Sequence, residues 1–470
     1  MSTTSELLLQ HHWDALVRSA PDAPALIDAA KQRVLSRAEI DSLAQTWAAR
    51  ANVSGVSLRG ARVGFALPNG ADWLTVFIGI IRLGGVALPI DASEPPAQQR
   101  TLASGARANF WWTGEALEPV AASEQKMSRP RKPIAEANNP FCLIKLTSGS
   151  TGRPRPLVFR DSEMIADGRA ICATMGITPK DINLGIIPFG HSYGLGNLLM
   201  PLLVQGTAVL CVSAPLPHAI AENCARWKPT VFPAVPALLR LLTLSDVSPS
   251  SFASLRTVIS AGSLLSPEIA QGFFEKFGRH VHGFYGSSET GGITYDRTGE
   301  ATLQGRSVGT PLEGVHLHFQ RGKRFLVESA SVFTVGNRRV RRQKADTTAS
   351  MLGRHRTADR GEINALGELT LLGRAGRMMK IAGRRIDLSE LEATVRKLTG
   401  VRDAFFMAHP QRPEELAGIV AGDLDLESMR ALLRRELAPW KVPKKLIVLA
   451  QFPLTGRGKT DTSALRRILE

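Results

Sequence analysis

The sequence contains few cysteines and gives no sign of a cysteine-based site. It has four in 470 residues, and no two of them are close together: Cys142, Cys172, Cys211 and Cys224. Zinc and redox sites are usually built from closely spaced cysteine pairs, so we expect neither kind of site. Isolated cysteines are among the most buried residues of folded proteins. We therefore predict four buried, reduced thiols.

Long apolar runs are also missing. The longest, at 74–83 and 198–212, contain or meet Arg82 and Gln205. Both are interrupted before they reach the roughly 18 residues of a membrane-spanning helix. The N-terminus lacks the charged start, apolar middle and small-residue cleavage site of a signal peptide. We therefore expect no membrane span and a cytoplasmic location.

Acidic residues are too few to balance the basic ones. The chain has 42 Asp and Glu against 58 Lys and Arg, a formal net charge of +16. Such an excess is compatible with nucleic acid, acidic lipid, phosphorylated substrates or an acidic protein. Only three tyrosines are present, and no basic stretch alternates with aromatics, so the stacking platforms that bind single-stranded nucleic acid are absent. We expect no nucleic-acid partner.

One dense basic run stands out, at residues 338–344. Charge runs of this kind are usually solvated loops, which is the interpretation we favour. A contact with phosphate or with an acidic protein is the alternative.

What the sequence does contain is a repeated strand–helix–strand rhythm, at 62–89, 183–212 and 230–260. This rhythm predicts parallel sheets layered with helices. Short alternating strands without a long helix, at 312–372, indicate a β-rich subdomain. We therefore predict an α/β fold with a large N-terminal domain, residues 1–375, made of layered α/β subdomains plus the β-rich subdomain. Residues 376–470 have their own helices and strands and form a small α+β C-terminal domain.

Residues 146–159, LTSGSTGRPRPLVF, combine small hydroxyl residues, glycines and two arginines. Small residues let consecutive backbone N–H groups converge on one anion, and the hydroxyls add donors. Arg153 and Arg155 would supply the countercharge. The stretch is not a Walker A loop, because Arg153 stands where that motif has lysine. A polyphosphate cradle and a flexible turn both remain open here.

A second stretch indicates different chemistry. Residues 190–194, GHSYG, fit the G-x-S-x-G elbow of serine hydrolases and lie between a predicted strand and a predicted helix. The acid and the histidine that should follow in that fold have no obvious context in this sequence. An α/β serine hydrolase with Ser192 as its nucleophile is therefore the alternative hypothesis.

A third stretch, FYGSSET at 284–290, joins an aromatic ring, hydroxyls and a carboxylate. These groups suit a purine, a phosphate and Mg²⁺, although alone they could form an ordinary turn. Together with the loop at 146–159, this stretch resembles the adenylate-forming (ANL) superfamily. That superfamily contains acyl- and aryl-CoA synthetases, luciferases and the adenylation domains of peptide synthetases. The resemblance spans nearly the whole chain, in many separated stretches in the same order.

The resemblance implies nucleotide-binding residues. The hydroxyl-rich loop would hold the ATP phosphates through Thr147, Ser148, Gly149, Ser150, Thr151 and Gly152. ISAGSLL at 259–265 would line the adenine through Ala261, Gly262 and Ser263. FYGSSET would contribute Phe284, Tyr285, Gly286, Ser287, Ser288 and Glu289, with Tyr285 at the base, Ser288 at the α-phosphate and Glu289 at magnesium. RTADRGEI, which corresponds to the TGD motif, would bind the ribose through Asp359, assisted by Arg374.

The resemblance also implies acyl-binding and catalytic residues. PFGHSYG at 188–194 is similar to the family's segment beside the acyl pocket, which would be shaped by His191, Tyr193, Gly194 and Ala261. Lys459, in PLTGRGKTD, would reach both the carboxylate and the α-phosphate. The C-terminal domain would be mobile about a hinge at Gly376, and its swing would bring Lys380 to the active site for thioester formation.

The implied reaction joins a carboxylic acid to ATP, releases pyrophosphate and passes the acyl group to a thiol. Two anions must meet, so a lysine and Mg²⁺ are needed to screen them. Amino-acid-activating relatives place an aspartate within 188–194, where this chain has no acid, so an aryl or fatty acid is expected. Coenzyme A and the phosphopantetheine of an acidic acyl carrier protein are both possible acceptors.

Four positions depart from the family pattern. Arg155 and Pro156 replace the lysine and glycine that usually end the phosphate loop, and Ala358 replaces the glycine of TGD. Gly376 replaces the usual aspartate or lysine of the hinge. Arginine keeps the charge of lysine but not its compact geometry. An adenylate-only ligase or an inactive relative therefore remains an alternative.

Overall fold

The computed structural model describes residues 8–53, 57–120, 141–147, 155–334, 352–374, 378–381, 384–455 and 458–470. The chain folds as two compact units. Unit 1 comprises 1–305, 309–316 and 327–355, and unit 2 comprises 306–308, 317–326 and 356–470. The boundary proposed from the sequence, between 375 and 376, stays a prediction, and the basic run at 338–344 lies outside the described residues.

Unit 1 contains a nine-stranded sheet in the order β15-β14-β13-β12-β11-β9-β10-β1-β2. Its six central strands, from β13 to β1, are parallel, and β2, β14 and β15 are antiparallel additions at the edges. The strands are β1 Pro24–Asp28, β2 Arg33–Ser36, β9 Ile182–Gly185, β10 Ala208–Cys211, β11 Val231–Ala234, β12 Thr257–Ser260, β13 Val281–Ser287, β14 Gly291–Tyr295 and β15 Thr310–Pro311.

A second sheet of unit 1 has six strands in the order β6-β5-β3-β4-β7-β8. Strands β5, β3, β4 and β7 are parallel, and the edge strands β6 and β8 are antiparallel. The strands are β3 Arg62–Phe65, β4 Val86–Pro89, β5 Phe110–Trp112, β6 Leu117–Pro119, β7 Phe141–Thr147 and β8 Arg155–Arg160.

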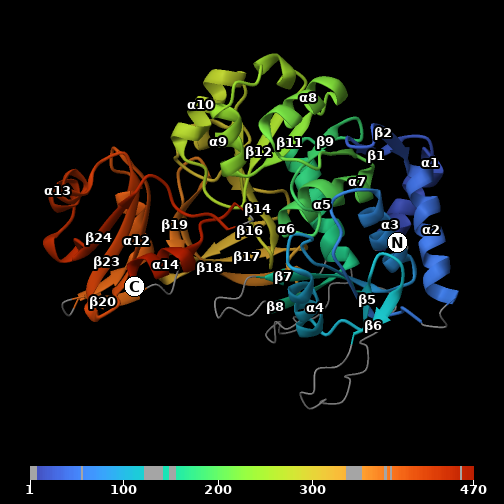
Figure 1. The fold of residues 1–470 in the computed structure, drawn as a ribbon, viewed down its shortest axis with the longest axis horizontal. Coiled ribbons are helices and arrows are strands. Elements are labelled where there is room, and N and C mark those ends of the chain that lie inside the picture. Colours follow the sequence, from blue (N-terminus) through green and yellow to red (C-terminus); the bar gives the residue numbers. More distant parts are fainter. Residues whose placement is uncertain are drawn as a thin grey trace, which may run out of the picture. The chain divides into compact units, whose positions relative to one another are not determined.

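Helices separate and cover these two sheets (Figure 1). The largest core draws residues from both sheets and from five helices between them: α1 Leu9–Ser19, α2 Arg37–Val53, α3 Ala71–Arg82, α5 Asp161–Met175 and α7 Met200–Gln205. The outer face of the larger sheet packs against α8 Pro217–Trp227, α9 Pro236–Leu244 and α10 Pro267–Phe277, and that of the smaller sheet against α4 Pro96–Gly105. The predicted layering of helices and parallel sheets is confirmed.

The apolar run at 74–83 forms most of α3, which is buried on nearly all sides. Eight of its 12 residues are buried. A Cβ atom on Gly79 would lie 2.3 Å from the Trp47 ring, so glycine lets α2 and α3 approach closely. A helix that is apolar all round is typical of the core of a large protein.

Unit 2 contains most of a four-stranded sheet and a smaller three-stranded one. The first sheet has β16 His316–Phe319, β17 Arg324–Ser329, β18 Gly353–Ile363 and β19 Leu369–Arg374, and confirms the predicted β-rich region. A hairpin of β20 Met378–Ile381 and β21 Arg384–Asp387 follows. The second sheet has β22 Val401–His409, β23 Arg412–Gly422 and β24 Lys445–Leu449, with helices α12 Leu388–Val395, α13 Leu426–Glu436 and α14 Thr462–Leu469.

All four cysteines are free and buried, as predicted. Burial raises the pKa of the Cys172 and Cys224 thiols to about 12, so both remain protonated at neutral pH. A protonated thiol is a poor nucleophile.

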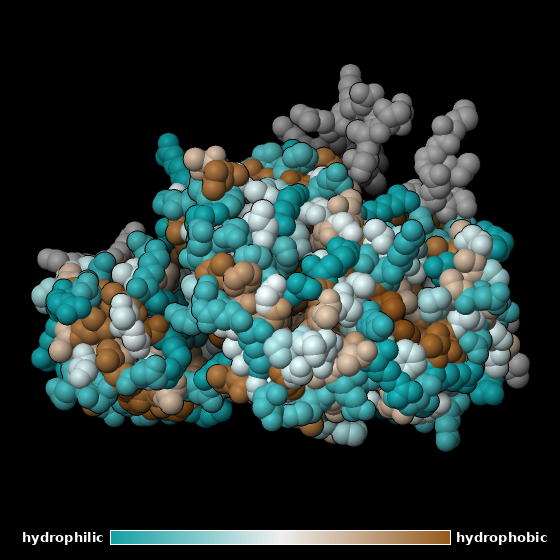
Figure 2. All heavy atoms as spheres, turned by 90° about the horizontal axis from the view of Figure 1, so that it is seen from above, coloured by the Kyte–Doolittle hydropathy of each residue, from teal (hydrophilic) through white to brown (hydrophobic). Residues whose placement is uncertain are grey.

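The surface is mostly polar on the face that Figure 2 shows. Hydrophilic side chains cover most of it, and hydrophobic ones lie in separate patches. Within the described part of the chain, every helix is either too short or too polar to cross a bilayer.

Asp161, the first residue of α5, is a buried carboxyl group with an altered ionisation. Its Oδ2 accepts a hydrogen bond from the backbone N–H of Leu9, at the start of α1, at 3.0 Å. Only 5% of Asp161 is exposed. Burial raises its pKa to about 6, from the ordinary 3.8, because a desolvated carboxylate is disfavoured.

Asp161→Asn is therefore expected to stabilise the protein at neutral pH relative to wild type. Between about pH 4 and 6 the folded state binds this proton more tightly than the unfolded state, so wild-type stability falls as pH rises through that window. Asparagine can still accept from Leu9 and does not ionise. Relative to wild type, its free energy of unfolding should rise by about 2 to 3 kcal/mol from pH 4 to pH 7. Urea unfolding of both proteins across this range measures it, and a pH-independent difference would contradict the assignment.

Candidate active site

The residues predicted for nucleotide and acyl binding in unit 1 lie at the carboxyl ends of parallel strands. Strand β12 ends just before Ala261, Gly262 and Ser263, and β13 carries Phe284, Tyr285, Gly286 and Ser287 in its last four positions. Ala261 is buried, whereas Gly262 and Ser263 are exposed. In open parallel sheets, ligands bind at this edge. Both sheets of unit 1 present such ends, because β4 and β7 also run parallel.

The hydroxyl-rich loop begins where β7 ends. Thr147 pairs with Arg155 across β7 and β8, and its Oγ1 donates to the Arg155 carbonyl at 3.4 Å. Ser148, Gly149, Ser150, Thr151 and Gly152 lie outside the described residues. The phosphate cradle therefore stays a prediction. The residues that flank this loop, Thr147 and Arg155, are paired in the β7–β8 ladder.

His191 is paired with a carboxylate that the sequence analysis did not single out. Its Nε2 lies 2.7 Å from Oδ2 of Asp91, which follows the end of β4. The hydrogen bond with His191 is the main reason why the pKa of Asp91 lies well below its usual range. An aspartate just past a parallel strand end was a signal that could have been used, since functional side chains gather there.

Asn69 fixes the backbone of the segment that leads to His191. Its side-chain amide donates to the carbonyls of Gly185 and Ile187, at 3.4 and 2.8 Å. Its Oδ1 accepts from the Phe189 N–H at 2.7 Å. Three hydrogen bonds from one side chain shape the chain between β9 and the short helix α6, Ser192–Gly194. The position of His191 is therefore set from both sides.

Tyr193 and Gly194 are packed into the protein. The Tyr193 hydroxyl donates to the Ile259 carbonyl at 3.1 Å, and its ring stacks on Phe284 with centroids 6.0 Å apart. Burial raises the pKa of Tyr193 well above its usual value, so the phenol stays neutral. A Cβ atom at Gly194 would lie 2.1 Å from the Pro188 carbonyl oxygen, so only glycine fits. These contacts join the predicted acyl segment to the predicted adenine segments.

Ser192 contacts the third motif. Its Oγ lies 2.8 Å from Oγ of Ser288, whereas the Nε2 of the neighbouring His191 faces Asp91. A hydrolase nucleophile needs a histidine as its hydrogen-bond partner. The hydrogen bond between Ser192 and Ser288 instead connects the segment at 190–194 with the segment at 284–290.

Ser192→Ala is expected to retain most of the acyl-adenylate formation that the sequence resemblance implies. A fluorophosphonate probe, which labels nucleophilic serines, should not label the protein. In this arrangement the Ser192 hydroxyl is hydrogen-bonded to Ser288, and it is not expected to form a covalent intermediate. Activity assays on the variant, with intact mass after probe treatment, test this. Stoichiometric labelling at Ser192 would restore the hydrolase hypothesis.

The turn that carries Ser288 and Glu289 is held by several hydrogen bonds. Ser287 Oγ lies 3.0 Å from Thr290 Oγ1. The Glu289 carbonyl accepts from the Phe333 N–H at 3.1 Å, and the Thr290 carbonyl accepts from Ser331 Oγ at 2.8 Å. These bonds fix the backbone on both sides of the Glu289 side chain, which is half-buried.

Glu289 suits a magnesium ion that is shared with a nucleotide. Among the described residues, no group of three or more His, Cys, Asp and Glu side chains could hold a metal ion. Mg²⁺ is commonly held by only one or two protein carboxylates, with substrate phosphates and water as its other ligands. The single carboxylate of Glu289, on the turn that follows β13, fits that pattern.

The remaining predicted residues belong to unit 2. Asp359 and Arg374 are register partners across β18 and β19, so the two residues implied to bind ribose are brought together. Lys380 pairs with Arg385 in the β20–β21 hairpin. The side chains of Arg374 and Lys380, and all of Gly376, lie outside the described part of the structure.

Lys459 is exposed, in a tight turn near the end of unit 2. Its carbonyl accepts from the Thr455 N–H at 2.7 Å, and Leu454 bridges Thr460 across the turn. Gly458 has a φ of +70°, a conformation that favours glycine. Asp461 then caps α14 by accepting from the N–H groups of Ser463 and Ala464. These hydrogen bonds and the bridge shape the turn that places Lys459 on the surface of this unit.

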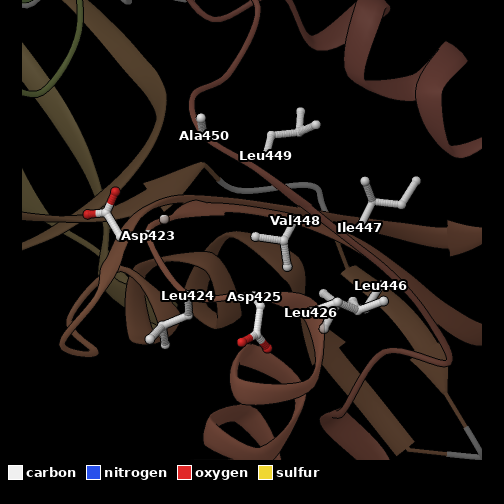
Figure 3. Close-up of a pocket in the computed structure, with 10 residues that line it drawn as sticks. Asp423, Leu424, Asp425, Leu426, Leu446, Ile447, Val448, Leu449 and Ala450 are labelled. Atoms are coloured by element: carbon white, nitrogen blue, oxygen red, sulfur yellow. The ribbon is translucent and has the colours of Figure 1, made fainter.

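Unit 2 also has a hollow that contains none of the predicted site residues (Figure 3). It is lined by residues 422–426 and 446–450. Asp425 accepts from the Ser428 N–H as the cap of α13, and Asp423 is paired with Arg402. Both carboxylates of the hollow therefore have structural partners.

A layered α/β fold with its motifs at the strand ends is the architecture expected of an adenylate-forming enzyme. Residues 13–319 match the family model described as AMP-binding enzyme. The chain therefore belongs to the AMP-binding enzyme family, within the adenylate-forming (ANL) superfamily.

Two curated relatives illustrate the similarity. Syringomycin synthase SyrB1 of Pseudomonas syringae pv. syringae is 26% identical, over 95% of this chain and 80% of the relative. Benzoate–CoA ligase of Thauera aromatica is 25% identical, over 89% of each. The chain also spans 6 to 7% of the length of three much larger synthases that it matches.

Among solved structures, ATP-bound MatB of Rhodopseudomonas palustris superposes with a TM-score of 0.80. The superposition covers 98% of both chains at 20% sequence identity. This likeness shows that the fold is shared over essentially the whole length.

Proposed function

We propose that this chain activates a carboxylic acid with ATP to give an acyl-adenylate and pyrophosphate, and then transfers the acyl group to a thiol. Family membership supports the first step. The observation that carries the proposal is the hydrogen bond between Ser192 and Ser288, which joins the predicted acyl segment to the predicted α-phosphate segment. The two reacting groups would meet where these segments meet.

In the first step, a carboxylate oxygen attacks the α-phosphorus of ATP, and the bond to the β-phosphate breaks. Ser288 would donate to the α-phosphate, and Thr147 with the loop at 148–152 would hold the β- and γ-phosphates. Tyr285 would stack on the base, and Asp359 with Arg374 would bind the ribose. Bound Mg²⁺, held by Glu289, would neutralise phosphate charge. Lys459 would screen the approaching carboxylate and the charge that develops on the α-phosphate.

The acyl side of the site favours an acid without an α-amino group. Segment 188–194 contains no carboxylate, and the Asp91 carboxylate is already paired with His191. That pair would hold the His191 ring in one orientation beside the acyl group. The similarity to benzoate–CoA ligase supports an aryl substrate, and a fatty acid is the second candidate.

The second step needs a thiol, and the relatives support two kinds of acceptor. Benzoate–CoA ligase supports coenzyme A, whereas the synthase relatives support a carrier-protein phosphopantetheine. The net charge of +16 suits the phosphates of coenzyme A and an acidic carrier protein equally well. We propose that residues 376–470 swing about Gly376 and that Lys380 then enters the site.

Thioester formation tests this proposal. The protein would be incubated with Mg²⁺, ATP and a panel of aryl and fatty acids, once with coenzyme A and once with a phosphopantetheinylated acyl carrier protein. Mass spectrometry should find a thioester on one acceptor, together with AMP. Acyl-adenylate without thioester on either acceptor would favour the adenylate-only ligase, and neither product from any acid would favour the inactive relative.

A further inference from the structure

Three charged side chains inside unit 1 have no role in the proposed function. Lys145 on β7 is 2% exposed, and Glu163 and Asp167 on α5 are each 3% exposed. Isolated charges in a protein interior are strongly destabilising unless they are paired and hydrogen-bonded. The contacts of these three side chains therefore show which parts of unit 1 they stabilise.

The two carboxylates lie on the same face of α5 and each accepts hydrogen bonds from a distant segment. Glu163 and Asp167 are four residues apart, and residues at this spacing are neighbours on a helix surface. Glu163 Oε1 accepts from the Thr334 N–H at 3.0 Å and from Thr334 Oγ1 at 2.7 Å. Asp167 Oδ1 accepts from the Gly292 N–H at 2.9 Å.

Both contacts lead to the turn that carries Ser288 and Glu289. Gly292 lies directly after this turn in the chain. Thr334 follows Phe333, whose N–H donates to the Glu289 carbonyl at 3.1 Å. Helix α5 is therefore hydrogen-bonded through Asp167 to Gly292, just after the turn, and through Glu163 to the segment at 331–334, which contacts Glu289 and Thr290 of the turn.

The contact between Asp167 and the start of β14 is too tightly packed for a side chain at Gly291. Gly291 has a φ of +72°, and a Cβ atom there would lie 2.2 Å from Asp167 Oδ1. Any other residue at 291 would be strained in its backbone and would displace the carboxylate. The position of Asp167 and the path of the turn therefore depend on each other.

Lys145 supplies the positive charge that this cluster needs. Its Nζ lies 4.1 Å from the centre of the Phe159 ring, a favourable position for a cation. The negative charges of Asp167, Glu163 and Glu289 favour the charged form of Lys145. Burial lowers the pKa of Lys145 and raises the pKa of Asp167, and each of the two charges opposes the shift of the other. Lys145 lies two residues before Thr147, on the strand that enters the hydroxyl-rich loop.

We propose that Lys145, Glu163 and Asp167 are positioning residues that fix the Ser288–Glu289 turn relative to the strand leading into the hydroxyl-rich loop. The proposal rests on the proposed function, because it takes these two elements as the nucleotide site. Groups that are already in place need no reorganisation when charge develops, which is how enzymes use fixed dipoles and ions. The buried cluster thus prepares the magnesium and α-phosphate contacts before ATP binds.

Asp167→Ala tests this role, with Asp181→Ala as the matched control. Asp181 is also a buried aspartate of unit 1, 6% exposed, but it pairs with Arg256 at the amino end of β9, the opposite end from the site. Asp167→Ala should raise the Kd of a Mg²⁺-bound, non-hydrolysable ATP analogue about tenfold in calorimetry, because a charge-assisted contact on the turn is lost. Asp181→Ala should lower the Tm and leave that Kd unchanged.

A second measurement reports on the turn without nucleotide. Hydrogen–deuterium exchange of residues 284–296 should become faster in Asp167→Ala and stay as in wild type in Asp181→Ala. If Asp167→Ala does not fold, Lys145→Met/Asp167→Ala removes the uncompensated ammonium as well. This double variant should recover Tm but not nucleotide affinity.

An unchanged Kd together with unchanged exchange at 284–296, in a folded Asp167→Ala or double variant, would overturn the positioning role. Wild-type protein that binds no nucleotide would instead refute the proposed function. In that case the exchange experiment still decides whether the cluster fixes the turn.

Discussion

Lys459→Ala is expected to reduce acyl-adenylate formation about a thousandfold while the fold stays intact. A group that stabilises charge in the transition state typically contributes this much to the rate. In the proposed reaction two anions approach each other, and the ammonium of Lys459 would be the charge that makes their approach possible. ATP–pyrophosphate exchange by the variant measures the loss of adenylate formation, and its Tm measures whether the fold stays intact.

The structure explains why stability should be preserved in this variant. Lys459 is exposed, and backbone hydrogen bonds together with the left-handed Gly458 shape its turn. Lys444→Ala is the matched control, since Lys444 is another exposed lysine of unit 2. Near-normal exchange in Lys459→Ala would remove Lys459 from the catalytic machinery.

Lys380→Ala is expected to separate the two half-reactions. Thioester formation should fall about a hundredfold, because a misplaced acceptor loses much of the advantage of proximity. Adenylation should be nearly unchanged, since the proposed swing brings the hairpin of β20 and β21 into the site only for the second step. Pyrophosphate exchange reports the first step, and single-turnover transfer from preformed acyl-adenylate reports the second.

Lys397→Ala, at another exposed lysine of unit 2, is the control for this experiment and should change neither step. Equal losses in both steps for Lys380→Ala would mean that its hairpin does not alternate between them. The proposed division of the chain at 375 and 376 would then lose its functional support.

Local signals made much of the fold predictable. Residues 62–89 show an apolar strand, a turn at Pro68-Asn69-Gly70, an apolar helix and a second strand, and the structure has β3, α3 and β4 there. Glycine and proline punctuate these elements, and the apolar runs between them are long enough to choose between helix and strand. The same signals located β12 at 257–260.

Non-local pairing was not predictable in this way. Strand β1 joins the larger sheet beside β10, about 180 residues later in the chain, with Leu26 opposite Val209. No short-range pattern records which strand lies next to which. The long strand β23 was also missed, because its apolar residues lie mostly in its second half, after Pro413, Glu414 and Glu415.

The buried charges were missed for a different physical reason. Glu163 and Asp167 resemble the solvated face of an ordinary helix, and Lys145 interrupts an otherwise apolar strand. Only the tertiary contacts with Thr334 and Gly292 show why charged residues are tolerated there. Functional sites are where local sequence rules are expected to fail, because the protein tolerates an unfavourable burial in return for a fixed geometry.

The motifs, in contrast, were found from the sequence because each combines residue types that are rarely adjacent for packing reasons alone. The structure adds the contact between Ser192 and Ser288 and the pairing of Asp359 with Arg374. It also adds Asp91, the partner of His191. The roles of these residues in catalysis remain predictions to be tested by the variants above.

ATP–pyrophosphate exchange by the wild-type protein, with Mg²⁺ and a panel of aryl, fatty and amino acids, directly tests whether this protein forms an acyl-adenylate. Exchange requires reversible formation of an adenylate and is independent of the thiol acceptor. We expect exchange with at least one aryl or fatty acid and none with α-amino acids. Exchange that requires an α-amino acid would contradict the assigned substrate class, and no exchange with any acid would contradict the proposed activity itself.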